Sequence, residues 1–250
     1  MGKAEKFALR YCLLLPDFTD TGVWQPQRWL GITGTLGNDS LSCWRRGVSM
    51  ISAKEAISRL KLGNAEFISA MQKDEQSLAI PVPDPGKVPA QKPFAVILSC
   101  ADSRVPPEVI FQQGCGQLFV QRVAGHVVDD FMRESVLFGC DGLGSRLILV
   151  LGHRDCGAVK ATLAMADPEA EEIPYLDQVR AEIQPAVEDL QRSYVDGSGS
   201  ERTEVINDAV AKHVQATVEK VRNFCTSGSD DLQVVGAVFD IASGEVLFLD

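Results

Sequence analysis

Two apolar stretches, Phe94-Ala-Val-Ile-Leu-Ser-Cys100 and Leu147-Ile-Leu-Val-Leu-Gly-His153, decide the fold class of this chain. Within them, residues 94–98 and 147–151 are continuous apolar runs of the length expected for a strand that is buried on both faces of a parallel sheet. A helical pattern from about Asp130 to Leu143 lies between them, which gives the strand-helix-strand spacing of a parallel crossover. The shorter run Leu118-Phe-Val120 predicts another buried strand of the same kind.

The segments around these runs add helices and a final hairpin. Helical patterns cover about residues 157–166, 175–194 and 202–225, and residues 232–250 have the pattern of a hairpin that turns at Ala242-Ser-Gly244. Ser52 and Glu55 have the spacing of a capping box and predict the start of an amphipathic helix. We therefore expect one α/β domain over residues 50–250, with a central parallel sheet flanked by helices.

The first 49 residues differ from the rest in composition. They contain all three tryptophans, and they show no sustained period of either a strand or a helix. We expect residues 1–49 to be an extension that is disordered or non-native to the domain. An ordered arm that wraps a partner subunit is the alternative.

Charge and cysteine content narrow the class of protein. The 250 residues contain 24 Lys and Arg against 34 Asp and Glu, a net charge of -10 that disfavours binding to nucleic acid or anionic lipid. Seven scattered cysteines in a chain of this size indicate reduced thiols rather than a disulfide framework. No apolar run approaches the roughly 18 residues of a membrane span. We expect a soluble, cytoplasmic protein with neither nucleic acid nor membrane as a partner.

The chemistry-bearing residues follow the two deciding strands. Cys100-Ala-Asp-Ser-Arg104 comes at the end of one strand, and His153-Arg-Asp-Cys156 comes at the end of the other. The carboxyl ends of parallel strands meet at one edge of the sheet, where ligands bind. Thiolate and imidazole are the ligands that zinc prefers, and three of them leave a fourth position for water. Either segment alone could hold an ordinary buried cysteine, so the joint placement is what indicates a metal site.

Asp102 and Arg104 point beyond a structural zinc site. An aspartate near the metal can coordinate it or accept a hydrogen bond from its water, and Arg104 can hold that carboxylate away through a bidentate pair. An Asp-Arg pair that only braces a loop is the alternative. Other candidates lack such a setting and are expected to be structural, ordinary polar or surface residues: Cys115, Cys140, Cys225, His126 and His213.

From about Ser52 to its C-terminus the sequence resembles the β-class carbonic anhydrases. The resemblance is densest in Cys100-Ala-Asp-Ser-Arg-Val-Pro-Pro-Glu108, Arg122-Val-Ala-Gly125 and Gly152-His-Arg-Asp-Cys-Gly-Ala158. It implies one zinc ion per chain, an antiparallel edge strand on the parallel sheet, and assembly as a homodimer or a larger homo-oligomer. It also implies roles for seven residues: Cys100, His153 and Cys156 as zinc ligands, Asp102 and Arg104 as the catalytic dyad, Gln91 as a hydrogen-bond partner of bicarbonate, and Phe119 as a pocket residue, the last two at a subunit boundary.

The activity that the resemblance implies is the reversible hydration of carbon dioxide to bicarbonate and a proton, with zinc lowering the pKa of bound water. His126 stands where family members commonly have Asn. Ile97 stands where a bicarbonate-regulated branch has Trp, whereas Arg122 occurs in both branches. We therefore expect the open form, in which Asp102 pairs with Arg104. Hydrolysis of carbon disulfide or carbonyl sulfide, and a zinc-stabilised module without turnover, are the alternatives.

Overall fold

A computed structural model of the chain describes residues 51–73, 86–170, 173–225 and 231–249. The expected extension, residues 1–49, lies outside the described residues and stays a prediction. Within the described part, the strands form a five-stranded sheet of order β2-β1-β3-β4-β5. Their bounds are β1 (Ala95–Cys100), β2 (Leu118–Val123), β3 (Leu147–His153), β4 (Gln233–Phe239) and β5 (Val246–Leu249). The pairs among β1 to β4 are parallel, and β5 runs antiparallel to β4, which confirms the expected fold class.

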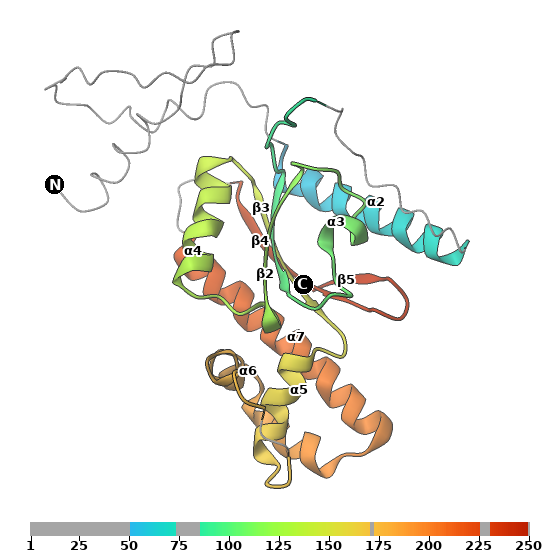
Figure 1. Cartoon of the computed structure of the whole chain (residues 1–250), viewed down its shortest axis with the longest axis vertical. Coiled ribbons are helices and arrows are strands. Elements are labelled where there is room, and N and C mark those ends of the chain that lie inside the picture. The colour runs from blue at the N-terminus through green and yellow to red at the C-terminus, as the bar shows by residue number, and fades with distance from the viewer. Residues whose placement is uncertain (1–50, 74–85, 171–172, 226–230, 250) are drawn as a thin grey trace, which may run out of the picture. The chain divides into compact units, whose positions relative to one another are not determined.

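Helices cover both faces of this sheet (Figure 1). One face carries α2 (Ala53–Gln72) and the short α3 (Pro107–Ile110). The other face carries α4 (Asp130–Leu137) and α7 (Gly199–Phe224), and α5 (Gly157–Leu163) and α6 (Asp177–Asp196) pack with α7 beyond the carboxyl ends of the strands. A π turn, Phe138–Gly142, continues α4, and short 3₁₀ turns lie at Ala124–His126 and Ala164–Ala166. None of the helices in the described segments has both the length and the apolar character needed to cross a bilayer.

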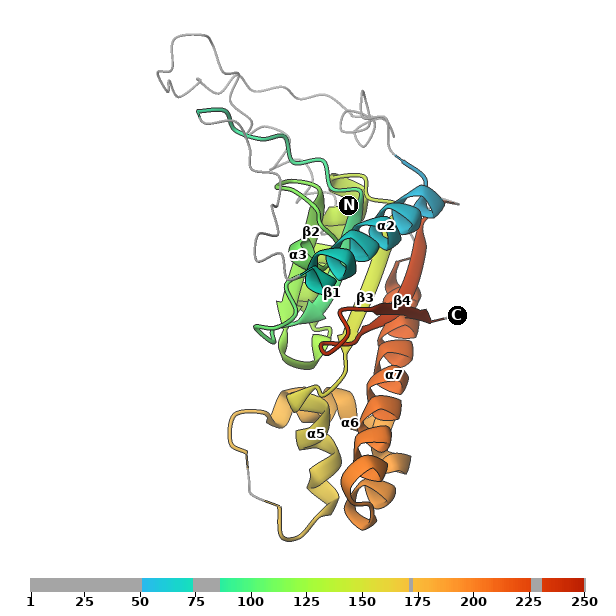
Figure 2. The same cartoon turned by 90° about the vertical axis from the view of Figure 1, so that its right-hand side faces the viewer.

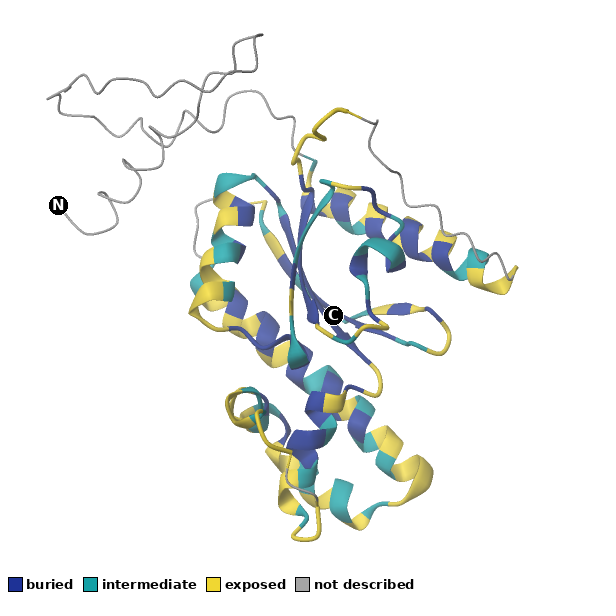
Figure 3. Ribbon diagram, viewed as in Figure 1, coloured by how far each residue is buried: buried dark blue, intermediate teal, exposed yellow. Residues whose placement is uncertain are grey.

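The central strands are apolar along their whole length because each contributes to two hydrophobic clusters. Alternate residues of a strand point to opposite faces of its sheet. Val96 and Leu98 accordingly pack with the cluster under α4 to α7, whereas Ala95 and Ile97 pack with the cluster under α2 and α3. Figure 3 shows the resulting band of buried strands between exposed helix surfaces. The continuous apolar runs of β1 and β3 therefore reflect burial on both faces.

Two glycines let α7 lie close to the sheet. A Cβ at Gly152 on β3 would lie 2.5 Å from a methyl group of Val214, and a Cβ at Gly236 on β4 would lie 2.7 Å from the other. Such contacts are far shorter than van der Waals distance, so a larger side chain at either position would push the helix away. Figure 2 shows α7 running along the sheet and past its carboxyl edge, where α5 and α6 pack beside it.

Local signals in the sequence explain where most elements begin. The Ser52 hydroxyl accepts a hydrogen bond from the amide of Glu55 at 3.2 Å, which confirms the predicted start of α2 and stabilises it by about 1 kcal/mol. Helix α7 begins earlier than the predicted residue 202, and its first turn is closed by a bond from the Ser198 amide to the Glu201 side chain at 3.4 Å. The prediction of a fully buried β2 was wrong, since β2 is an edge strand with one neighbour and is mostly half-buried.

Candidate metal centre

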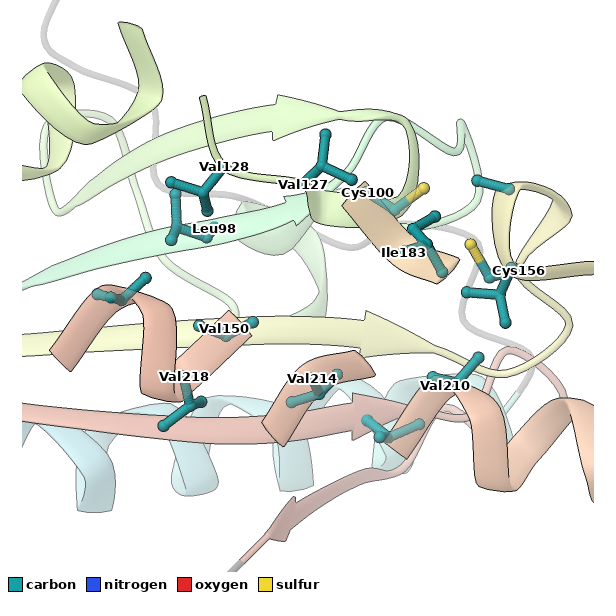
Figure 4. Close-up of a cluster of buried hydrophobic side chains, with 14 of the residues drawn as sticks. Leu98, Cys100, Val127, Val128, Val150, Cys156, Ile183, Val210, Val214 and Val218 are labelled. Atoms are coloured by element: carbon teal, nitrogen blue, oxygen red, sulfur yellow. The ribbon is translucent and has the colours of Figure 1, made fainter. Parts of the chain in front are cut away.

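Three potential ligands converge at the carboxyl edge of the sheet. Cys100 is the last residue of β1, His153 is the last residue of β3, and Cys156 caps the start of α5. The parallel register of the two strands brings their ends together. One ligand atom from each residue lies within 4.8 Å of the others, and all three residues are buried. Figure 4 shows both sulfur atoms at one end of the hydrophobic cluster, beside Ile183.

The hydrogen bond of His153 defines which ring nitrogen can bind a metal. Its Nδ1 lies 2.9 Å from the carbonyl oxygen of Arg154, and a carbonyl can only accept, so Nδ1–H is the donor. In the neutral ring, the lone pair is then on Nε2. This nitrogen is buried and has no hydrogen-bond partner in the described part of the chain, a costly arrangement unless a cation takes that place.

The two neighbouring thiols shift each other's pKa in a way that favours binding of a cation. The contact with the Cys156 thiol lowers the pKa of Cys100 to about 4, against the opposing effect of burial. The same contact, together with burial, raises the pKa of Cys156 well above its usual range. One sulfur is therefore a ready thiolate, and a divalent cation would provide the charge needed to deprotonate the second. Two thiolates and one imidazole with an unused lone pair fit a zinc ion.

Asp102 and Arg104 form a bidentate pair beside this cluster. Arg104 Nε donates to Asp102 Oδ1 at 3.0 Å and Nη2 donates to Oδ2 at 2.7 Å, while the Arg104 amide bonds Oδ1 at 2.9 Å. These hydrogen bonds hold the pKa of Asp102 well below its usual range, so the carboxylate is charged. Its Oδ2 lies 3.9 Å from Nε2 of His153. The charged Asp102 carboxylate, a hydrogen-bond acceptor, is thus held close to the three potential metal ligands but is paired with Arg104.

Arg122 fixes the loop that carries these residues. From the neighbouring strand β2, its Nε donates to the carbonyl oxygen of Cys100 at 3.0 Å, and its Nη2 donates to that of Asp102 at 2.5 Å. Two carbonyls of the Cys100–Asp102 turn therefore depend on one guanidinium group. Arg122 belongs to the motif Arg122-Val-Ala-Gly125, which marks it in the sequence. The motif does not indicate which backbone groups the Arg122 side chain binds.

Gln91 and Phe119 lie far from the cluster within one chain. Gln91 is exposed and precedes β1, whose opposite end carries Cys100. Phe119 pairs with Val96, four residues before Cys100, which corresponds to about 13 Å along the strand. The aromatic ring of Phe119 instead contacts Phe138, with 6.0 Å between ring centroids. The structure therefore brings together the expected metal ligands and the Asp-Arg pair, and leaves these two residues at the other end of the sheet.

The remaining candidates occupy different environments. Cys140 is buried in the hydrophobic cluster, Cys225 is half-buried and Cys115 is exposed. The two other histidines are both buried, with His126 fully inaccessible and His213 at 3% exposure, so of the two expected settings, ordinary polar or surface, the surface one was wrong. Neither belongs to the three-residue cluster that could hold a metal. Single-residue patterns gave no signal that these two side chains would meet in the core.

Comparisons with known proteins converge on one family. Residues 95–246 match the carbonic anhydrase family. Carbonic anhydrase from Mycolicibacterium smegmatis is 34% identical over 197 residues, which cover 75% of this chain and 88% of that protein. Carbonic anhydrase 2 from Mycobacterium tuberculosis is also 34% identical over 197 residues, covering 76% and 90%. Among solved structures, Coccomyxa β-carbonic anhydrase in complex with acetazolamide has a TM-score of 0.54 at 28% identity, covering 64% of this chain and 73% of that one.

Proposed function

The chain belongs to the carbonic anhydrase family, in its β class, and on this premise we propose that it catalyses the reversible hydration of carbon dioxide to bicarbonate and a proton with one zinc ion per chain. The observation that carries the proposal is the convergence of Cys100, His153 and Cys156 at the sheet edge with a charged Asp102 beside them. Three protein ligands leave a coordination position free, as catalytic zinc sites do.

The side chains around the site have separable roles in this proposal. When bound, zinc would act as a Lewis acid that lets water ionise near neutral pH. His153 would present its Nε2 lone pair, because its Nδ1–H is engaged by the Arg154 carbonyl. Asp102 would accept a hydrogen bond from the reacting water and so orient it. Arg104 would keep that carboxylate in place and prevent it from taking the open position itself.

A second copy of the chain would complete the substrate pocket. Gln91 and Phe119 cannot reach the metal ligands of their own chain, since β1 separates them from Cys100. Phe138, whose ring contacts that of Phe119, is 49% exposed. This exposed apolar surface lies beside the edge strand β2 and is available for a subunit contact. We therefore propose a homodimer or a larger homo-oligomer in which Gln91 and Phe119 face the partner's metal site.

The two alternatives have less support. A structural zinc module would need a fourth Cys or His, and within the described residues the candidate cluster has only three members. Hydrolysis of carbon disulfide or carbonyl sulfide would use the same metal site. The charged Asp102–Arg104 pair and a bicarbonate-binding role for Gln91 favour carbon dioxide.

The site also bears on where the protein works. Metal binding requires Cys100 and Cys156 in reduced form, and the cysteines in the described part of the chain are free thiols. We place the protein in a reducing compartment such as the cytoplasm.

Metal analysis combined with stopped-flow carbon dioxide hydration on the purified chain tests the proposal. We expect one zinc per chain and turnover that disappears on chelation and returns with added zinc. Bound zinc without hydration of carbon dioxide would instead favour the structural module. Faster turnover of carbon disulfide than of carbon dioxide would favour the alternative of carbon disulfide or carbonyl sulfide hydrolysis.

A further inference from the structure

Two buried histidines that the proposed reaction does not use lie behind the metal centre. The rings of His126 and His213 contact each other in a tilted arrangement, with 4.5 Å between ring centroids and an angle of 34° between the rings. Burial lowers the pKa of both, so both are neutral near pH 7. Burying two imidazole rings is costly unless they form hydrogen bonds, which raises the question of what each ring contributes there.

His213 forms one hydrogen bond, and it leads to the metal site. Its Nε2 lies 2.8 Å from the carbonyl oxygen of Gly125, so the Nε2–H of the neutral ring is the donor. The amide of the same Gly125 donates to Sγ of Cys100 at 3.3 Å. His213 on α7 is thereby connected through a single residue to a metal ligand on β1.

The backbone conformation at Gly125 needs surrounding contacts to hold it. Its φ of +65° lies in the left-handed region, and a Cβ there would lie 2.7 Å from Cδ1 of Ile183. His126, the next residue, also has a positive φ, of 44°. Two successive residues in this region form a strained turn that surrounding contacts must hold. The close approach of α7 at Gly152 puts His213 within reach of this turn.

We propose that His213 is a positioning residue for the metal-binding thiolate, because it holds Gly125 in the conformation in which the Gly125 amide donates to Cys100 Sγ. The inference rests on the proposed metal site. An N–H donor withdraws electron density from a thiolate, so this bond limits the charge that Cys100 gives to the metal. Loss of the donor would leave a more electron-rich and less well-oriented sulfur.

His126 provides a matched control for this role. Neither of its ring nitrogens has a hydrogen-bond partner among the described residues, where its recorded interaction is the ring contact with His213. His126→Phe keeps a ring of similar shape and removes no hydrogen bond. His213→Phe keeps the ring contact and removes the donor, whereas His213→Gln keeps a donor and removes the aromatic contact. The three variants therefore separate the hydrogen bond from the packing.

The test uses the full chain loaded with cobalt in place of zinc, and follows the sulfur-to-cobalt charge-transfer band. We expect His213→Phe to move the band to longer wavelength, because an electron-rich sulfur is easier to oxidise, and to weaken zinc affinity about tenfold. His126→Phe and His213→Gln should keep the wild-type band. An unmoved band in a folded His213→Phe protein, or an equal movement in His126→Phe, would overturn the proposal.

A second measurement needs no variant and, if His213→Phe does not fold, tests the hydrogen bond from Gly125 to Cys100 on which the inference depends. In the wild-type chain loaded with cadmium-113, we expect a scalar coupling between the Gly125 amide proton and the metal, transmitted through the hydrogen bond to sulfur. Absence of this coupling would contradict the inference. A wild-type chain that binds none of these metals would overturn the proposed function and the inference together, whereas normal metal binding without the coupling overturns the inference alone.

Discussion

The two ends of strand β1 differ in how much of the proposed site a single chain provides. At the carboxyl end, Cys100 lies in a buried setting with hydrogen bonds to its sulfur and its carbonyl oxygen. At the amino end, Gln91 is exposed and Phe119 is half-buried on an edge strand. Under the proposed function, metal binding would depend on one chain, and placing the substrate would depend on two.

Removing any one of the three proposed metal ligands, at the carboxyl end of the sheet, should abolish both metal binding and activity. We expect Cys100→Ala, His153→Ala and Cys156→Ala each to reduce carbon dioxide hydration to background and to lose most bound metal, because two remaining ligands hold zinc weakly. Elemental analysis and stopped-flow assays would measure both. Cys140→Ala is the control, since Cys140 is buried in the same hydrophobic cluster without being a ligand candidate. Full zinc occupancy in any ligand variant would contradict the assignment.

Arg104→Ala should lower turnover at the same site while leaving the metal bound. Without its bidentate partner, Asp102 is free to move towards the metal, so we expect turnover to fall roughly 10- to 100-fold while metal content stays near one per chain. Arg154→Ala removes a comparably exposed arginine whose partner is Asp240, at 2.7 Å, and should leave turnover unchanged. Equal losses in the two variants would mean that charge at this edge matters more than the Asp102–Arg104 contact.

Gln91→Leu tests whether the amino end serves the partner chain. We expect kcat/KM to fall about tenfold with metal content intact, the effect of losing one hydrogen bond to a charged ligand. Mixing Gln91→Leu chains with Cys156→Ala chains should restore about a quarter of wild-type activity, because half of randomly paired dimers contain one complete site of two. Lys92→Gln, at the adjacent exposed position, is the control. A mixture no more active than its components would place Gln91 outside the partner's site.

A chain that starts at Met50 should show the smallest effect. The described site residues all follow Met50, and α2 has its own cap at Ser52. We expect activity and thermal stability within experimental error of the full chain. Loss of activity or of assembly, measured by sedimentation, would support the alternative of an arm that wraps the partner.

Sequence patterns predicted the parts of the structure that depend on local order. The apolar runs of β1 and β3 indicated buried parallel strands, and their order along the chain placed Cys100 and His153 at one edge. The contact between His213 and Gly125 was not predictable in this way, because these residues are 88 positions apart and neither belongs to a periodic pattern that marks the other. The exposure of β2 was missed for a related reason: an apolar run does not reveal whether a strand has one neighbour or two.

The crossover between Cys100 and His153 also determines when a metal can enter during folding. Cys100 meets the other two ligands only after β1 and β3 have paired. These strands are neighbours in the sheet, but β2 and α4 separate them in the sequence, and contacts so distant in sequence form late. In a zinc finger, by contrast, closely spaced ligands let the ion draw the chain together. Zinc should therefore leave the refolding rate of this chain unchanged and slow its unfolding, a difference that denaturant-jump kinetics with and without the ion would reveal.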